Sequence, residues 1–302
     1  MIRILFFGAT GKLGFNWINK LLSEHKNIIA NVHKNFLFSK KNLIQKKIDI
    51  FDDQIINYCK KKKISIIINC VGLTDVDACQ KNIKLAYHLN AEIPNRLCEI
   101  SKKLNIRFIH ISTDMLFNGL SKKKYSEKSK CNPINIYSKT KLDAENKVKS
   151  YSKTLIIRTN FFGFSNKKNM TFSDKILFEQ KSKKTSYLWN NVIFTPIYIN
   201  TLIFFIDLLI KKKKFGIYNV VSDDIVSKYD LGIKLCKDLF VKLKIKPTNF
   251  KKNKFVIRPQ NMTLSNMKLK KLFPKEVEKL KLKNQIKEFI KHYKSLNYDK
   301  QS

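Results

Sequence analysis

Three residues of this sequence have the types and the order that proton transfer to a carbonyl group requires. Tyr137 and Lys141 stand four residues apart, so a helix would place the phenol and the ammonium on one face. Thr113 precedes them, at the end of an apolar run. A carbonyl that receives a hydride develops negative charge on oxygen, and Tyr137 could protonate it as a general acid. Lys141 could lower the phenol pKa from its ordinary value of about 10, and Thr113 could hydrogen-bond the same oxygen.

The spacing of Tyr137 and Lys141 is not specific by itself. The chain has 61 Lys and Arg residues and 11 Tyr, and Tyr58 with Lys62 forms a second pair of the same kind. Position separates the two pairs, because Tyr58 has no strand-end hydroxyl before it. The catalytic interpretation therefore depends on the order of the elements, in which a strand ending in a hydroxyl residue precedes the helix with the tyrosine and the lysine.

Apolar runs of strand length alternate with amphipathic stretches, which predicts an α/β fold with a doubly wound parallel Rossmann-type sheet. After residue 160 the alternation fades. We expect a dinucleotide-binding domain over 1–160, rejoined by about 191–221, and a smaller C-terminal substrate-binding lobe over 161–190 and 222–302. The predicted strands are Ile2–Phe7, Ile28–His33, Ile48–Ile50, Ile64–Cys70, Arg107–Ser112, Thr154–Arg158 and Phe215–Val221, and the main predicted helices are Gly11–Ser23, Ile83–Leu104, Tyr137–Lys149 and Ile197–Ile210.

A glycine-rich turn joins the first predicted strand to its helix. Gly8, Gly11 and Gly14 would allow a pyrophosphate to approach the N–H groups of the helix N-terminus. We assign Thr10, Lys12 and Leu13 to the same cofactor site.

The second predicted strand ends in Asn31-Val32-His33-Lys34, without the acidic residue that usually holds the ribose of NAD(H). Lys12 and Lys34 could bind a 2′-phosphate, which favours NADP(H) over NAD(H). We place His33 in this cofactor site, and Asp49 and Ile50 could meet the adenine edge.

The chain resembles the extended short-chain dehydrogenases/reductases, and among them the dTDP-4-dehydrorhamnose reductase-like sugar-nucleotide reductases. The matching segments are 8–14, 69–79, 89–91, 112–117, 135–141 and 158–161. The resemblance implies that Thr113, Tyr137 and Lys141 are catalytic and that Lys141 also holds the nicotinamide ribose. It places the strand end of Asn69, Cys70, Val71 and Gly72 along the cofactor, with Asn90 helping to position cofactor or water, and it places Thr74, Asp114, Asn160 and Arg258 at the substrate. Met115 and Leu116 depart from the family's pattern, so the sugar is not assigned.

Composition adds expectations about partners and location. The formal charge of +38 comes almost entirely from lysines spread over almost every segment, and only five arginines occur, so we expect no specific nucleic-acid partner. The six cysteines form no C-x-x-C pair, and we expect no metal site. The longest apolar stretch, 197–210, is too short to span a bilayer. We expect a cytoplasmic protein, with a homodimer possible.

The leading hypothesis is NADPH-dependent reduction of a 4-keto group on a nucleotide-activated deoxy sugar, for surface polysaccharide. Two alternatives remain open at this point. One is a nucleotide-sugar epimerase or dehydratase on the same scaffold. The other is a non-catalytic, regulatory dinucleotide-binding subunit, against which the three residues Thr113, Tyr137 and Lys141 argue.

Overall fold

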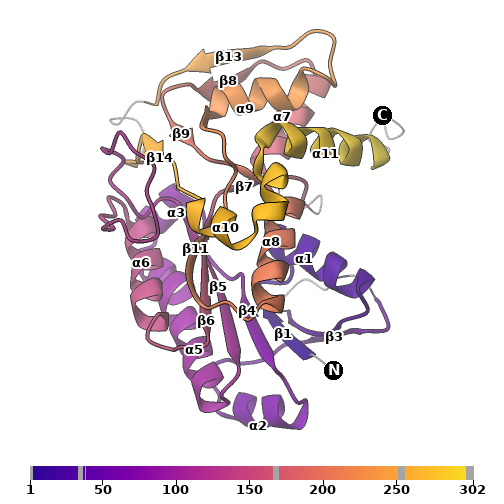
Figure 1. The fold of residues 1–302 in the computed structure, drawn as a ribbon, viewed down its shortest axis with the longest axis vertical. Coiled ribbons are helices and arrows are strands. Elements are labelled where there is room, and N and C mark those ends of the chain that lie inside the picture. Colours follow the sequence, from indigo (N-terminus) through magenta and orange to yellow (C-terminus); the bar gives the residue numbers. More distant parts are fainter. Residues whose placement is uncertain (1–2, 33–36, 38, 166–169, 251–255, 297–302) are drawn as a thin grey trace.

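A parallel sheet of seven strands forms the centre of the protein in a computed structural model, which describes residues 3–32, 37, 39–165, 170–250 and 256–296 (Figure 1). The strand order is β11-β6-β5-β4-β1-β2-β3, and every neighbouring pair is parallel. The strands are β1 (Arg3–Phe7), β2 (Asn27–Asn31), β3 (Leu43–Lys46), β4 (Ile66–Asn69), β5 (Arg107–Thr113), β6 (Thr154–Thr159) and β11 (Gly216–Asn219). The predicted doubly wound fold class is confirmed.

Alternating side chains of the central strands supply two separate cores, one on each face of the sheet. Ile66 and Ile68 of β4 pack on one face with α1 (Lys12–Ser23) and α8 (Ile199–Lys211). Ile67 packs on the other face with α2 (Gln54–Lys61), α5 (Ile93–Lys103) and α6 (Ile136–Val148). Both faces of the sheet are covered by helices, which explains the continuous β-branched sequence of β4.

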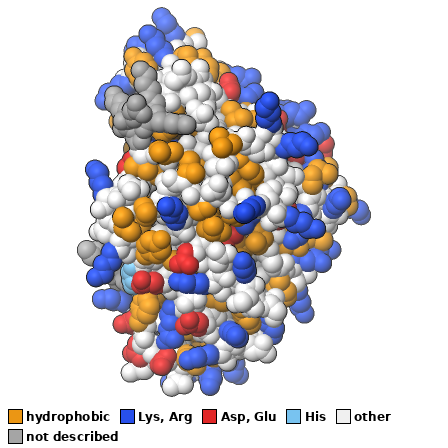
Figure 2. Space-filling view, turned by 90° about the vertical axis from the view of Figure 1, so that its left-hand side faces the viewer, with side chains coloured by type: hydrophobic (Ala, Val, Ile, Leu, Met, Phe, Trp, Pro, Cys, Tyr) orange, Lys and Arg blue, Asp and Glu red, His pale blue; other side chains and the backbone are white. Residues whose placement is uncertain are grey.

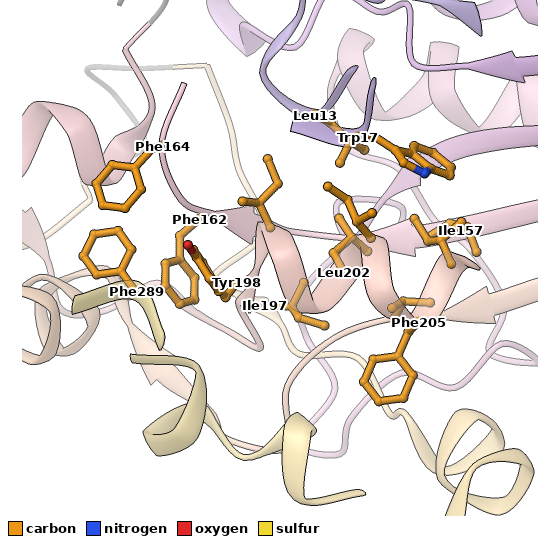
Figure 3. Close-up of a cluster of buried hydrophobic side chains, with 14 of the residues drawn as sticks. Leu13, Trp17, Ile157, Phe162, Phe164, Ile197, Tyr198, Leu202, Phe205 and Phe289 are labelled. Carbon is orange, nitrogen blue, oxygen red and sulfur yellow. The ribbon is translucent and has the colours of Figure 1, made fainter. Parts of the chain in front are cut away.

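Aromatic and aliphatic side chains of the first core extend from the sheet into the C-terminal elements. Figure 3 shows Trp17 of α1 and Phe205 of α8 near Ile157 of β6, with Phe162, Phe164 and Phe289 grouped further along. The ring centroids of Phe164 and Phe289 lie 4.5 Å apart in a stacked arrangement. One buried cluster therefore spans the sheet and the elements beyond it.

Most of the remaining elements gather beyond the end of the sheet where β5 and β6 finish (Figure 1). The short strands are β7 (Phe161–Phe162), β8 (Ser186–Trp189), β9 (Ile193–Phe194), β10 (Ile197–Tyr198), β12 (Val226–Ser227), β13 (Ile245–Thr248) and β14 (Asn261–Met262). The other helices are α3 (Val76–Lys81), α4 (Ile83–Tyr87), α7 (Phe172–Lys181), α9 (Lys228–Cys236), α10 (Met267–Leu272) and α11 (Leu282–Ser295), with a 3₁₀ turn at Pro274–Leu280. In the described ranges no helix is both long and apolar enough to cross a bilayer.

Three predicted elements differ from the structure. The third strand lies at β3 and not at 48–50, because Leu43 to Lys46 pair with Ile28 to Asn31 of β2. The predicted helix over 83–104 contains a π-helical segment at His88–Glu92 between α4 and α5. The predicted helix over 197–210 begins at Ile199, since Ile197 and Tyr198 pair with β7.

Candidate active site

The glycine turn between β1 and α1 requires glycine at two positions for different reasons. Gly8 has φ +79°, and a Cβ there would lie 2.5 Å from the carbonyl carbon of Cys70. A Cβ on Gly14 would lie 2.1 Å from the Gly8 oxygen. The turn thus packs directly against the end of β4, and Gly11 begins α1 without a side-chain cap. The first turn of α1, which the structure describes fully, holds Lys12 and no acidic residue, so its N–H groups suit an anion.

Thr113, Tyr137 and Lys141 lie together at the carboxyl ends of the central strands. Thr113 is the last residue of β5, and α6 presents Tyr137 and Lys141 one helical turn apart. All three are buried, with exposed fractions of 4%, 8% and 4%. The side chain of Asn135 caps α6 by accepting from the Ser138 N–H at 2.9 Å, which fixes where the helix begins.

The electrostatics of Tyr137 differ from the sequence-based expectation. Burial raises the pKa of the Tyr137 phenol above its ordinary value, and a hydrogen bond with Thr113 acts in the opposite direction. Lys141 donates to the Ile111 carbonyl at 2.6 Å, and its Nζ lies 3.4 Å from Nε2 of His110. Burial lowers the pKa of Lys141 to about 8. The expected lowering of the Tyr137 pKa by Lys141 is therefore not seen in this structure.

Asn90 has a different set of contacts from the one expected of a cofactor ligand. Its Oδ1 accepts from the Leu73 N–H at 2.8 Å, and its Nδ2 donates to the Leu73 carbonyl and to Thr140 Oγ1, each at 3.1 Å. The side chain is fully buried. Asn90 thus ties the loop after β4 to α6, and its π-helical segment brings the amide to that position.

Two of the predicted substrate residues contact each other. Asn160 Nδ2 donates to Asp114 Oδ2 at 2.7 Å, and Thr113 Oγ1 donates to Asp114 Oδ1 at 3.2 Å. Burial raises the pKa of Asp114 to about 6, although these hydrogen bonds and Lys228 act in the opposite direction. Asp114 therefore stands directly beside Thr113 as a buried acceptor.

Arg258 already has a partner. Its Nη2 donates to Asp77 Oδ2 of α3 at 2.6 Å, and the guanidinium lies over the rings of Trp189 and Phe250. Lys228 lies over Trp189 and Phe172. Two cations and a group of aromatic rings thus face one another near Asp114, an arrangement suited to phosphates and a planar base.

The other predicted site residues fall in different places. His33 and Lys34 lie outside the described residues. Asp49 is exposed and accepts from the Phe51 N–H at 2.9 Å, while Ile50 is buried in the second core. Cys70 and Val71 are half-buried beside Gly8, and Gly72 and Thr74 are exposed in the loop after β4. The half-buried residues Thr10 and Lys12 and the buried Leu13 follow Gly8 in the glycine turn and α1.

Three residues of this region were not predicted from the sequence. His110 lies inside the buried strand β5, where the sequence pattern indicates only a core. Lys228 and Trp189 lie beyond residue 160, where no motif marked them. The serine before Lys228 offered one signal, because Ser227 and Asp230 form a capping box that begins α9 and so places Lys228 at its first position.

Fold and site together define an oxidoreductase of the extended short-chain dehydrogenase/reductase class. The family model described as the RmlD substrate binding domain matches residues 2–295, and the chain belongs to this family.

Individual relatives agree with this family. A dTDP-4-dehydrorhamnose reductase of Aggregatibacter actinomycetemcomitans is 27% identical over 243 residues, covering 77% of this chain and 78% of the relative. The crystal structure of a dTDP-4-dehydrorhamnose reductase from Clostridium acetobutylicum has a TM-score of 0.81 at 26% identity, covering 97% of this chain and 100% of that one. A dTDP-4-dehydrorhamnose reductase from Bacillus anthracis in complex with NADP has a TM-score of 0.83 at 24% identity, with the same coverage.

Proposed function

We propose that this protein reduces the 4-keto group of a nucleotide-activated deoxy sugar with NADPH, as a step in making surface polysaccharide. The observation that carries the proposal is that Thr113 at the end of β5 and Tyr137 and Lys141 of α6 are all buried, with Lys141 one turn beyond Tyr137. Tyr137 donates the proton to the carbonyl oxygen, and Thr113 hydrogen-bonds the same oxygen. The homology to sugar-nucleotide reductases supports this reaction.

The glycine turn is the proposed binding site of the cofactor's pyrophosphate. Glycine at positions 8 and 14 allows a tight backbone turn that a side chain would block, and α1 begins without a side-chain cap. Its first N–H groups are therefore suited to bind a diphosphate. NADPH, when bound, supplies the hydride. We favour NADP(H) over NAD(H) because β2 ends in Asn31 and because Lys12 stands at the start of α1.

Residues 161–190 and 222–302 form the proposed substrate-binding lobe. Asp114 and Asn160 offer hydrogen-bond partners for the sugar beside Thr113. Lys228 and Arg258 offer positive charge for the diphosphate, and Trp189 offers a ring for the base. The homodimer and the cytoplasmic location stay predictions.

Tyr137→Phe tests the catalytic assignment. NADPH oxidation is measured with a panel of nucleotide 4-keto-6-deoxy sugars, and NADPH binding is measured separately by fluorescence. We expect the rate to fall about a hundredfold or more, because the general acid is lost, with little change in NADPH affinity. Tyr58→Phe is the matched control, since it alters the other tyrosine–lysine pair, and it should retain the wild-type rate.

Three outcomes would contradict the proposal. Equal rates for Tyr137→Phe and wild type would remove Tyr137 from the reaction. Turnover without net NADPH oxidation, with NAD(H) retained, would favour an epimerase or dehydratase. Cofactor binding without reduction of any keto sugar would favour a regulatory subunit.

A further inference from the structure

His110 is a fully buried imidazole that the proposed reaction does not use. It lies in β5, three residues before Thr113, and both ring nitrogens face polar groups. Nδ1 lies 3.2 Å from Asn69 Nδ2 of β4, and Nε2 lies 3.4 Å from Lys141 Nζ of α6. The imidazole thus connects a sheet neighbour with the proposed catalytic lysine.

The backbone fixes the direction of the first hydrogen bond. The Val71 N–H can only donate, and it donates to Asn69 Oδ1 at 3.0 Å. The Asn69 amide must therefore turn its NH₂ group towards His110. A flipped amide would bring two donors together at that distance, which is unfavourable.

That direction determines the tautomer of His110. Nδ1 faces a donor and must accept, so it carries no hydrogen. The hydrogen of the neutral ring then sits on Nε2, which points at Lys141 Nζ. An ammonium has no lone pair and cannot accept a hydrogen bond, whereas a neutral amine can.

We propose that His110 is a positioning residue that holds Lys141 as a neutral amine until the cofactor binds. The amine accepts from His110 Nε2–H and donates to the Ile111 carbonyl. Each group in this chain of hydrogen bonds donates to the next: the Val71 N–H to Asn69, the Asn69 amide to His110, and His110 to Lys141. Burial acts in the same direction, because it lowers the pKa of both His110 and Lys141.

The groups around Lys141 do not fix its protonation state, so a bound ligand can change it. Glu145 lies one turn along α6, but it is paired with Arg158 of β6 through Oε2 and Nη2 at 2.7 Å. The half-buried Cys70 follows β4, and burial raises the pKa of its thiol. Tyr137 lies one turn earlier, with its pKa raised. Within the described residues, no unpaired carboxylate faces Lys141 from these elements to hold the ammonium form.

The consequence for catalysis rests on the function proposed above and on the role that the family resemblance implies for Lys141, which is to hold the nicotinamide ribose. Hydroxyl oxygens accept hydrogen bonds and so favour the ammonium form. Lys141 then takes up one proton from solvent as NADPH binds. The positive charge of its ammonium group is therefore present one helical turn from Tyr137 once NADPH is bound. Free enzyme and complex differ by that proton.

The first test reads the tautomer directly and needs no substrate. The chain has five histidines, so a long-range ¹H–¹⁵N spectrum of histidine-labelled protein without cofactor is tractable, and His110→Gln identifies the His110 signals by their loss. We expect a neutral ring with its hydrogen on Nε2 at pH 8.5, which lies above the Lys141 pKa of about 8. A hydrogen on Nδ1, or a doubly protonated ring, overturns the proposal whether or not any keto sugar is reduced.

The second test counts protons taken up when NADPH binds, by calorimetry at pH 8.5 in two buffers of different ionisation enthalpy. We expect wild type to take up more than about half a proton. His110→Gln can offer Lys141 an amide oxygen, so the ammonium is already present and uptake should fall towards zero. His110→Asn keeps an acceptor for Asn69 but loses the N–H that faces Lys141, so its uptake should also fall below that of wild type. Equal uptake in all three proteins overturns the proposal.

Discussion

At the scale of single residues, burial is the dominant influence on the proposed catalytic groups. It raises the pKa of Tyr137 and of Asp114, and it lowers the pKa of Lys141. Each group is therefore biased towards its neutral form in the protein alone. If the reaction needs one of these groups in its charged form, bound ligands must stabilise that form.

Gly8 is the residue at which the smallest substitution should have a large effect. Gly8→Ala places a Cβ against the backbone of Cys70 and Val71 at a positive φ, so we expect a loss of about 2 kcal/mol or more in the free energy of unfolding. NADPH affinity should fall with it. Denaturant unfolding and fluorescence titration measure the two quantities.

Gly11→Ala is the matched control for this prediction. Gly11 has φ −74°, and an added Cβ would meet only the Gly8 oxygen, at 3.2 Å. We expect it to be clearly milder in both measurements. A Gly8→Ala protein as stable as Gly11→Ala would show that the turn adjusts more easily than its contacts indicate.

The sequence identifies some site residues and not others for a physical reason. Tyr137, Lys141 and Thr113 could be proposed from the sequence because the chemistry requires their types in a recognisable order. His110 was missed because a polar residue within a strand has no marker until its cross-strand neighbour is known. The partner of Arg258 was missed for the same reason, since Asp77 is 181 residues away.

At the scale of elements, α1 and α8 are joined by a buried polar contact between Trp17 and Asp207. The indole Nε1 donates to Asp207 Oδ1 at 3.0 Å, and Oδ2 has no partner among the described residues. Burial raises the pKa of Asp207 to about 6. A carboxylate at this position is therefore costly above that pH.

Asp207→Asn should stabilise the protein at pH 8. The folded pKa lies above the unfolded one, so the contribution of Asp207 to stability is complete below about pH 4 and is lost as the pH rises through 6. The loss is at most about 3 kcal/mol, and asparagine can still accept from Trp17. Denaturant unfolding at pH 8 and pH 5 should show a gain that shrinks at the lower pH.

The exposed Asp238 provides a control, because Asp238→Asn should change stability little at either pH. A pH-independent effect of Asp207→Asn would mean that the carboxyl group remains neutral throughout, or that it is hydrated.

Long elements were predictable and short ones were not. The strands β1, β4, β5 and β6 and the helices α1 and α6 follow from apolar runs and helical periodicity. The two-residue strands β7, β9, β10, β12 and β14 leave no periodic pattern, because they are defined by distant partners. The shift from 48–50 to β3 has a local cause: Ile48 and Ile50 are buried, but Asp49 accepts from Phe51 and turns the chain.

At the scale of the whole molecule, positive charge is spread and not concentrated. Figure 2 shows lysine and arginine side chains scattered over the visible face, between apolar patches and acidic side chains. The basic side chains on that face therefore do not form a continuous positive strip of the kind that binds a nucleic-acid backbone.

The contact between Asp77 and Arg258 links the segment after β4 with the proposed substrate lobe. Asp77→Asn should raise the KM for the nucleotide sugar by about three- to tenfold, because Arg258 loses its anchor, and should leave the Kd for NADPH unchanged. Arg258 holds the pKa of Asp77 below its usual value, so the effect should be constant from pH 6 to 9.

Asp143→Asn, which removes an ion pair on α6 with Lys147, controls for a general change in charge. Equal changes in the KM for the sugar and the Kd for NADPH on Asp77→Asn would show that the contact holds the fold and not the substrate lobe.

The position of α8 has a consequence for how the chain is made. Leu202, Phe205 and Ile206 cover one face of a sheet whose first six strands are complete by Thr159. A ribosome therefore releases the strands before the helix that shields them, and a nascent chain that has emerged only to residue 160 exposes that apolar face. Stalling or cleavage in this interval would produce a chaperone-dependent, aggregation-prone intermediate.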